Sequence, residues 1–365
     1  MVRAAVMTGP DQPLELVRFA NPQLEPGGMV LETIYSEVCG TDVHLWRGRL
    51  SGVPYPIIPG HVTVGRVEQV AGTVSDVSGE PIKTGDVVTF LDVHETCGRC
   101  YYCQVARTST RCPHRRVYGI TYSASEGLLG GWSQKVYLKP GVHVLRLPPA
   151  LSPERFIGGG CGLPTAFHAV ERAGVRLGES VVIQGSGPVG LAAVMLARLS
   201  GALQVIVVGG PRLRLDMALR LEAELALDIG DLSPAQRVQA VLDATGGRGA
   251  DVTIEATGVP AALSEGMAMT RDGGRYVVAG QYTDAGEVSF NPHRLLNQKH
   301  LSLLGCWGTD LSHLYRGMAL LSKFGSRFPL ELTISHRYGL SGTGQALLDV
   351  EKQRVIKAVI DPSLP

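Results

Sequence analysis

The stretch Ser180-Val181-Val182-Ile183-Gln184-Gly185-Ser186-Gly187-Pro188-Val189-Gly190 decides the fold of this 365-residue chain. An apolar run leads into the pattern Gly-x-Gly-x-x-Gly, the apolar segment 191–199 is typical of a helix, and a second apolar run follows at 204–208. This order of strand, turn, helix and strand forms the unit that binds dinucleotides, because backbone N–H groups at the turn can approach a pyrophosphate. We predict that a dinucleotide binds at Gly185, Gly187 and Gly190; the alternative is a doubly wound sheet that holds no cofactor.

The alternation of strands and helices continues downstream. Strand-like runs at 250–255 and 274–278 each end at a glycine-containing turn, and the segment 262–269 between them has a helical pattern. This alternation predicts a parallel sheet that extends to about residue 300. Because cofactors sit at the carboxyl ends of such strands, we predict that Thr257 and Gly280, in the two turns, line the nicotinamide half of the cofactor.

The end of the second strand bears on the choice between NAD and NADP. An acidic residue there usually holds the ribose hydroxyls of NAD, but this chain has Gly209, followed by Arg212 and Arg214. Loss of the acid removes the repulsion against a 2′-phosphate, and an arginine can bind that phosphate. The sequence therefore predicts NAD or NADP, with Arg212 or Arg214 near the phosphate of NADP. Alternatively, both arginines are solvated residues at the start of a helix.

The first 150 or so residues have a different character. Short extended runs broken by Gly and Pro predict a mostly β domain. These runs are 29–35, 62–70, 87–91 and 136–138. Ser152 and Pro153 then mark the start of a helix. Beyond residue 300, a helix-like segment at 314–324 and a β-like run at 355–360 form a tail.

Four of the seven cysteines are clustered, at Cys97, Cys100, Cys103 and Cys112. Cysteines on one tight loop can place four sulfurs tetrahedrally around Zn²⁺. With all four positions taken by Cys, no coordination site remains for water, so we predict a structural zinc in a lobe at about 95–115. The alternative is four unrelated thiols on a surface loop, which would be an oxidation liability.

Three other segments carry groups whose chemistry is ambiguous. Cys39-Gly40-Thr41-Asp42-Val43-His44 brings together a thiol, a hydroxyl, a carboxylate and an imidazole. His61 precedes a predicted strand, and Cys161 lies in a Gly-rich stretch. From the residues alone, Cys39 and Cys161 are either metal ligands or small buried residues, and His61 is either a ligand or a satisfied turn residue.

Composition limits the classes of function. At 38.9 kDa the chain is long enough for about two domains. The formal net charge is +1, without a long basic or acidic block, which disfavours nucleic acid and anionic membranes as partners. No apolar run is long enough to span a bilayer and the first residues do not resemble a signal peptide, so we expect a cytoplasmic protein with a small-molecule substrate.

Taken together, these residues resemble the zinc-dependent alcohol dehydrogenases of the medium-chain dehydrogenase/reductase superfamily. The likeness covers nearly the whole chain and rests on motifs in the family's order. They are Cys-Gly-Thr-Asp-x-His at Cys39, Gly-His-x-x-x-Gly at Gly60, the four-cysteine lobe, Gly-Cys-Gly at Cys161 and the dinucleotide pattern. The resemblance implies an α/β fold with a GroES-like, mostly β catalytic domain at 1–150 and a Rossmann domain, a doubly wound parallel sheet, at 151–300. The tail at 301–365 would rejoin the catalytic domain.

The resemblance also implies roles for individual residues. The implied ligands of a catalytic zinc are Cys39, His61 and Cys161, which makes two zinc ions per chain. Asp42 would orient His61, and Thr41 and His44 would relay the alcohol proton. Thr165 and Val189 match positions that line the nicotinamide, and Lys357 matches a cationic contact to the pyrophosphate. The resemblance assigns no role to the seventh cysteine, Cys306.

The chain departs from the family pattern at four places. Val62 follows the zinc-binding His where the family commonly has Glu, which bears on how water is displaced from the metal. The interval from Cys103 to Cys112 is one residue longer than usual, and Gly209 replaces the usual acid. Residues 222–224 stand where relatives often have a Gly-containing turn.

The resemblance favours an NAD(P)-dependent zinc alcohol dehydrogenase that acts on a secondary or cyclic alcohol, or on the matching ketone or aldehyde. Trp46, Tyr118 and Trp307 are either pocket walls or core aromatics. Two alternatives are a conjugate reductase of the same superfamily, which would reduce a C=C bond, and a non-catalytic cofactor-binding protein. Apolar runs near Tyr276 and at 301–304 are either edge strands of a homodimer or homotetramer, as the resemblance implies, or internal strands.

Overall fold

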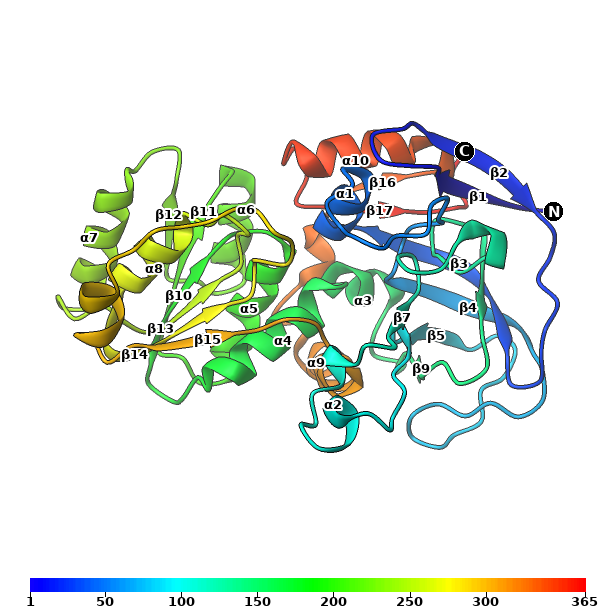
Figure 1. The fold of residues 1–365 in the computed structure, drawn as a ribbon, viewed down its shortest axis with the longest axis horizontal. Coiled ribbons are helices and arrows are strands. Elements are labelled where there is room, and N and C mark those ends of the chain that lie inside the picture. The colour runs from blue at the N-terminus through cyan, green and yellow to red at the C-terminus, as the bar shows by residue number, and fades with distance from the viewer. The chain divides into compact units, whose positions relative to one another are not determined.

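The computed structural model describes residues 1–365 and consists of two compact units, whose elements are labelled in Figure 1. The first unit comprises Met1–Gly160, Asp310–Gly325 and Leu330–Pro365. The second comprises Cys161–Thr309 and Ser326–Pro329. The unit boundaries in the structure, after residues 160 and 309, fall about ten residues after the predicted ones at 150 and 300, and residues 326–329 of the predicted tail belong to the second unit.

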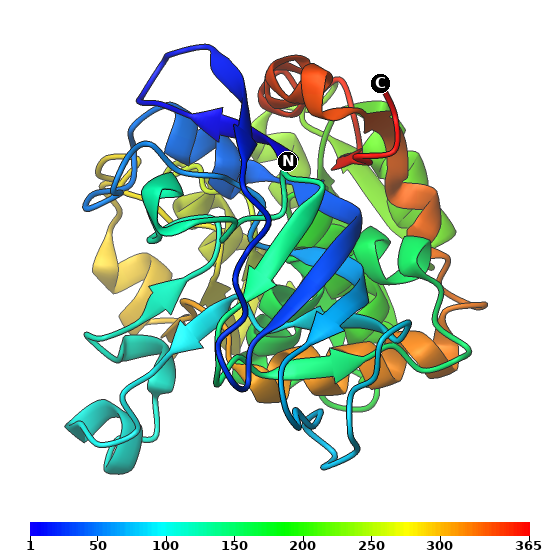
Figure 2. The same cartoon turned by 90° about the vertical axis from the view of Figure 1, so that its right-hand side faces the viewer.

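The first unit is built on a seven-stranded sheet, part of which is seen in Figure 2. In spatial order its main path runs through β16 (Ile334–Tyr338), β17 (Lys357–Ile360), β3 (Met29–Val38), β4 (Thr63–Val70), β5 (Val87–Phe90) and β9 (Val144–Arg146), and β8 (Lys135–Leu138) also pairs with β3. The tail strand β17 pairs antiparallel with β3, with Val359 opposite Glu37. The end of the chain is thus hydrogen-bonded to the strand that leads to Cys39.

Smaller elements complete the first unit. They are β1 (Val2–Met7), β2 (Leu14–Phe19), β6 (Val93–Glu95), β7 (Arg116–Val117), α1 (Gly40–Trp46), α2 (Tyr101–Gln104), α3 (Pro153–Gly159), α9 (Leu311–Phe324) and α10 (Thr343–Glu351). Helix α3 begins as predicted, because the Ser152 hydroxyl accepts the N–H of Arg155 and Pro153 occupies the first helical position. It ends at Gly160, whose φ of +49° favours glycine.

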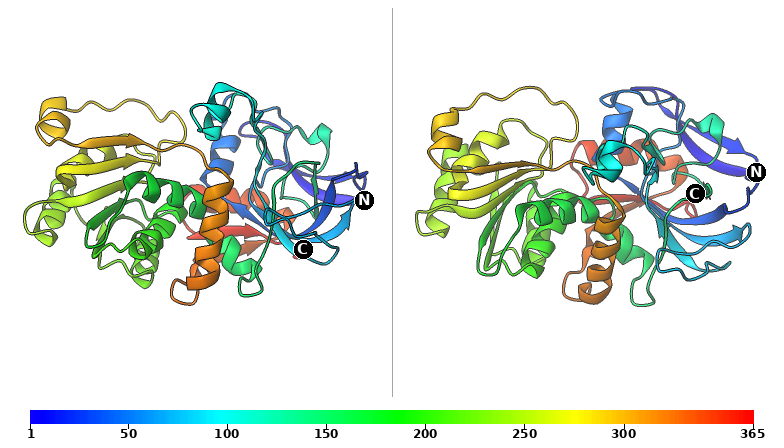
Figure 3. Two further views of the ribbon diagram at one scale, coloured as in Figure 1. Left: turned by 90° about the horizontal axis from the view of Figure 1, so that it is seen from below. Right: turned by 60° about the horizontal axis from the view of Figure 1, so that its bottom comes forward.

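The second unit is a six-stranded parallel sheet with the order β12-β11-β10-β13-β14-β15. Its strands are β10 (Ser180–Gln184), β11 (Gln204–Gly209), β12 (Leu225–Asp228), β13 (Ala250–Glu255), β14 (Thr270–Val278) and β15 (Ser302–Gly305). Its helices are α4 (Gly162–Ala173), α5 (Pro188–Leu199), α6 (Arg212–Arg220), α7 (Pro234–Ala244) and α8 (Ala262–Met269). The sheet grows in opposite directions from β10 and β13, so right-handed connections place helices on both faces, as Figure 3 shows.

The sheets explain the apolar patterns in the sequence. Strands β10 and β11 are buried almost throughout, as expected for strands covered by helices on both faces. Tyr276 in β14 is fully buried and internal, whereas β15 forms an edge of the sheet and leaves Leu303 40% exposed. The predicted α/β class is therefore confirmed, and of the two apolar runs only 301–304 lies at an edge.

No helix of the structure combines the length and the apolar character that crossing a bilayer requires.

Candidate metal and cofactor sites

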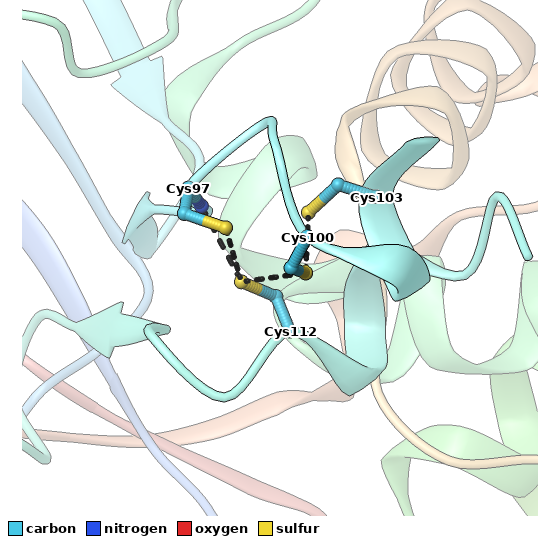
Figure 4. A group of neighbouring side chains, drawn as sticks. All are labelled: Cys97, Cys100, Cys103 and Cys112. Atoms are coloured by element: carbon cyan, nitrogen blue, oxygen red, sulfur yellow. Dashed lines mark hydrogen bonds between the residues drawn. The ribbon is translucent and has the colours of Figure 1, made fainter. Parts of the chain in front are cut away.

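The four clustered cysteines lie between β6 and β7 and converge on one point, as Figure 4 shows. Their sulfurs all lie within 4.8 Å of one another. The separations are 3.6 Å for Cys100–Cys103, 4.0 Å for Cys100–Cys112 and 3.6 Å for Cys97–Cys112. A tetrahedral ion with Zn–S bonds of about 2.3 Å separates its sulfurs by about 3.8 Å, so the group fits zinc.

The electrostatics of this group also suit a cation. The backbone N–H of Arg99 lowers the pKa of the Cys97 thiol to about 6, whereas burial raises the pKa of Cys103 to about 12. One thiolate therefore forms readily, but further thiolates need a positive charge among them. The long interval before Cys112 is taken up by a 3-10 turn at Ser109–Arg111.

A second group of metal ligands consists of Cys39, His61 and Cys161, whose ligand atoms also lie within 4.8 Å of one another. Cys39 follows β3 and is the N-cap residue of α1, His61 precedes β4, and Cys161 is the N-cap residue of α4. Cys39 Sγ lies 3.8 Å from His61 Nε2, the separation that a shared tetrahedral ion requires. Cys39 and His61 are buried, so a polar cluster of this kind needs a partner that satisfies it.

The surroundings of His61 point to a positive charge at this place. Burial lowers the pKa of the imidazole, but Cys39 and Asp42 outweigh burial and hold that pKa well above its ordinary value. The field thus favours a cation, which a divalent metal would supply. Asp42 Oδ2 accepts the backbone N–H of Cys39 at 2.9 Å, while Asp42 Oδ1 lies 3.9 Å from His61 Nδ1. Asp42 Oδ1 and His61 Nδ1 are both buried without a hydrogen-bond partner. The structure therefore brings Asp42 beside His61, but the two atoms are too far apart for the hydrogen bond by which Asp42 was predicted to orient His61.

Thr41 and His44, the predicted proton relay, lie on the short helix α1 that begins after Cys39. They are three residues apart, so their side chains share one face of the helix. Both are partly buried. Burial lowers the pKa of His44, and the positive charge of Arg49 lowers it further. His44 is therefore neutral, and able to accept a proton, over most of the pH range of a cell.

The dinucleotide pattern forms the predicted strand, turn and helix, and each glycine meets a different need. Gly185 has a φ of +109° in the turn. Gly187 starts α5 with no atom within 4 Å of where a Cβ would lie, so a phosphate can approach the backbone. At Gly190 a Cβ would lie 1.9 Å from the carbonyl oxygen of Gly185, so only glycine allows helix and turn to pack.

At the end of β11, a Cβ on Gly209 would lie 2.6 Å from Ser186 Oγ. Ser186 is buried, and its hydroxyl bonds the backbone of Gly210. The space in which an acidic side chain would begin is therefore taken by Ser186. Arg212 is exposed and pairs with Asp216 at 2.8 Å, whereas Arg214 is buried, which lowers its pKa.

Glu255, at the end of β13, was not predicted as a functional residue. It is fully buried, and its carboxylate accepts bonds from both predicted nicotinamide turns. The donors are the N–H and hydroxyl of Thr257 at 2.7 Å each, the N–H of Gly258 at 2.8 Å and the N–H of Gly280 at 3.0 Å. One carboxylate thus fixes the turns at Thr257 and Gly280 to each other. A charged residue at the end of an otherwise apolar strand is the sequence feature that could have identified Glu255 as a functional residue.

The two residues matched to the nicotinamide lie on neighbouring helices of the second unit. Val189 is in α5, and the Thr165 hydroxyl in α4 donates to the carbonyl of Cys161 at 2.9 Å. A Cβ on Gly162 would lie 2.6 Å from the carbonyl oxygen of Pro188, so the first turns of α4 and α5 are in contact. This packing places Thr165 and Val189 near each other.

Lys357 lies away from solvent, and its ammonium pairs with Glu37 Oε1 at 2.6 Å. Its predicted contact to the pyrophosphate remains a prediction. Of the three aromatic candidates, Tyr118 is fully buried and packs against Phe90, so it belongs to the core. Trp46 bonds the carbonyl of Gln12, and Trp307 is 39% exposed.

Two family profiles match this chain. The alcohol dehydrogenase GroES-like domain matches residues 25–149, and the zinc-binding dehydrogenase profile matches residues 188–323. Among curated proteins, 5-exo-hydroxycamphor dehydrogenase of Pseudomonas putida is 35% identical over 93% of both chains. L-threonine 3-dehydrogenase of Pyrococcus abyssi is 30% identical over 92% of this chain and 91% of its own.

Solved structures agree with these matches. An alcohol dehydrogenase from Thermotoga maritima has a TM-score of 0.93, 36% identity and 99% coverage of both chains. A zinc-binding dehydrogenase from Sinorhizobium meliloti, bound to NADP, has a TM-score of 0.85, 25% identity and the same coverage. The likeness that the motifs predicted is confirmed over the whole chain, together with its GroES-like and Rossmann domains. This chain belongs to the zinc-dependent, NAD(P)-dependent alcohol dehydrogenases of the medium-chain dehydrogenase/reductase superfamily.

Proposed function

We propose that this alcohol dehydrogenase oxidises a secondary, cyclic alcohol, or reduces the matching ketone, at the group formed by Cys39, His61 and Cys161. The observation that carries the proposal is the convergence of these three ligand atoms within 4.8 Å, while four cysteines form a complete set elsewhere. Three protein ligands leave a coordination position for a substrate oxygen, whereas four sulfurs leave none. We therefore assign the catalytic zinc to the first group and the structural zinc to the second.

The chemistry divides between the metal and the protein. A zinc ion at the three-ligand group supplies a Lewis acid that stabilises the negative charge developing on the alcohol oxygen. In the proposed mechanism, the Thr41 hydroxyl hands the alcohol proton towards His44, whose lowered pKa keeps it a neutral acceptor. A bound nicotinamide would supply the acceptor for the hydride of the carbinol carbon. The turns at Thr257 and Gly280, which Glu255 fixes to each other, and the residues Thr165 and Val189 would position the nicotinamide ring.

The substrate class rests on one of the relatives. The relative named for 5-exo-hydroxycamphor, a cyclic secondary alcohol, shares 35% identity over 93% of each chain.

We further propose that NADP is accepted as well as NAD. Gly209 and Ser186 leave the end of β11 without an acidic side chain, so a 2′-phosphate meets no carboxylate from that position. The exposed guanidinium of Arg212 lies on the next helix and is the closest candidate in sequence to bind it. A relative from Sinorhizobium meliloti binds NADP.

For assembly and compartment, we propose a homodimer or homotetramer in the cytoplasm. Strand β15 ends the sheet of the second unit and leaves Leu303 40% exposed, and an uncovered edge strand can pair with that of another copy. All seven cysteines are free of disulfides, which suits a reducing compartment.

Zinc analysis of the purified enzyme combined with an alcohol screen tests the proposal. We expect two zinc ions per chain and alcohol-dependent reduction of NAD(P), with a higher kcat/KM for cyclic secondary alcohols than for short primary ones. One zinc ion and no turnover of any alcohol would contradict the catalytic assignment. With an enone and a deuterated cofactor, deuterium at the carbinol carbon supports the alcohol reaction, whereas deuterium on the former C=C bond identifies a conjugate reductase.

A further inference from the structure

Glu37 and Lys357 form an ion pair inside the first unit. Lys357 Nζ lies 2.6 Å from Glu37 Oε1, and the two side chains are 0% and 1% exposed. Burial of a charge costs several kcal/mol per ion, which pairing offsets only in part or in full, and a well-packed apolar pair is often at least as stable. Val359, two residues after Lys357 in β17 and on the same face of the sheet, is apolar and fully buried, so the pair lies in the core of the unit. A gain in stability is therefore a poor explanation for this pair.

The side chains of the pair contact two of the three segments that carry the ligands of the catalytic group. Glu37 lies two residues before Cys39 in β3. On the other side, Lys357 Nζ donates to the carbonyl of Ile157 at 3.2 Å, near the end of α3, which leads to Cys161. The segment of His61 is joined to β3 by a main-chain bond, from the N–H of Glu37 to the carbonyl of Val62 at 3.0 Å.

Gly160, which precedes Cys161, packs against the same pair. A Cβ built on Gly160 would lie 2.0 Å from Glu37 Oε2 and 2.5 Å from Lys357 Nζ. Any other residue would push the carboxylate or the backbone away, so glycine is required here for close approach as well as for its positive φ. The backbone that leads to Cys161 is therefore packed directly against the ion pair.

We propose that Glu37 and Lys357 are positioning residues, which hold the segments of Cys39 and Cys161 in the geometry that binds the catalytic zinc together with His61. The proposal rests on the ligand set given under Proposed function. The two charges cancel, so the pair adds no net charge beside the metal and acts through geometry. Loss of one partner leaves a buried, unpaired charge, and relaxation of that charge towards water would separate the segments.

The test measures zinc release from the intact enzyme in Lys357→Met and Glu37→Gln. The rate at which each zinc is transferred to a coloured chelator is compared with that of the wild type. Mutation of residues that support metal ligands typically lowers metal affinity ~10–100-fold. We therefore expect the catalytic zinc to leave ~10–100-fold faster in both variants and the structural zinc to leave at the wild-type rate. Cobalt placed at the catalytic group should show shifted absorption bands in both variants.

Glu265→Gln is the matched control, because it breaks the Arg237–Glu265 pair, which is 2.7 Å long and only 10% and 11% exposed, in the second unit. It should lower thermal stability without changing either release rate. Wild-type release rates and cobalt bands in both test variants would overturn the proposal, as would equal acceleration of both zinc ions. If Lys357→Met does not fold, Lys357→Arg is used instead, because it keeps the positive charge but changes the length and shape of the side chain. Unchanged cobalt bands in Lys357→Arg would also overturn the proposal. A wild type that binds only one zinc would instead refute the ligand set itself.

Discussion

The two candidate metal-binding groups of this enzyme are assembled in opposite ways. The four-cysteine group takes every ligand from residues 97–112, on one loop between β6 and β7. The group of Cys39, His61 and Cys161 draws on three segments that only the fold brings together. The first group needs little beyond its own loop, whereas the second depends on supports such as the Glu37–Lys357 pair. A site assembled from distant segments can keep an open coordination position, because its surroundings hold the ligands in place.

The largest expected effect is that of Cys161→Ala, which removes one ligand of the distributed group. We expect the zinc content to fall from two to one per chain and kcat to fall on the order of 10³-fold, because Lewis-acid stabilisation is worth several kcal/mol. Metal analysis and steady-state kinetics check this. Cys306→Ala is the control, since burial raises the pKa of that thiol to about 11 and no role is assigned to it. Full activity and two zinc ions in Cys161→Ala would refute the assignment.

Cys103→Ser tests the local group. We expect loss of the structural zinc and several kcal/mol of local stability in the lobe, with the catalytic zinc retained. Trypsin should then cut the lobe, which contains Arg99, Arg107 and Arg111, much faster than in the wild type. Ser109→Ala in the same lobe is the control. If Cys103→Ser loses kcat as completely as Cys161→Ala, the two groups do not differ as proposed.

Cofactor choice offers a further contrast between local pattern and fold. Gly209→Asp alone should disturb the fold, because its Cβ would meet Ser186. With Ser186→Gly added, the side-chain clash is removed and only the backbone nitrogen of residue 186, 2.9 Å from the new Cβ, still has to shift. We then expect the kcat/KM ratio of NAD over NADP to rise ~10–100-fold, the value of a charged hydrogen bond of about 1.5–3 kcal/mol. Ser186→Gly alone is the control. An unchanged ratio in the double variant would show that this position does not discriminate between the cofactors.

The smallest expected effect concerns pH. A neutral His44 accepts the proton, so alcohol oxidation should decline on the acid side only below the ordinary histidine pKa of about 6.5, because burial and then Arg49 lower the pKa of His44. Arg49→Gln removes one lowering cause, so the acid limb of kcat should move to higher pH. Arg18→Gln, an exposed arginine on β2, serves as control. A shift to lower pH in Arg49→Gln would contradict the role of His44.

Much of the fold could be predicted because its signals are local. The pattern at 250–255 gave β13 and that at 262–269 gave α8 with their observed bounds. Helix α9 starts at Leu311, three residues before the predicted 314, because the Asp310 side chain caps the N–H groups of Ser312 and His313. Polar capping residues lie outside the apolar pattern, so the pattern alone misses them.

The site was predictable where spacing or family motifs define it, and not where contacts between distant residues do. Lys357 and Glu37 are 320 positions apart, so the pattern of neither strand shows that the two side chains meet. Glu255 became visible only when the turns at Thr257 and Gly280 were both in place. Buried polar groups depend on partners that the fold supplies, so their roles follow from the structure.

The most direct test of the difference between the two groups is the visible spectrum of enzyme in which cobalt replaces zinc at one group at a time. The spectrum is recorded before and after addition of a cyclic secondary alcohol with oxidised cofactor. We predict that the bands of cobalt held by Cys39, His61 and Cys161 change on addition, while those of cobalt held by the four cysteines stay the same. A response at the four-cysteine group alone, or at neither group while the alcohol is oxidised, would contradict the account.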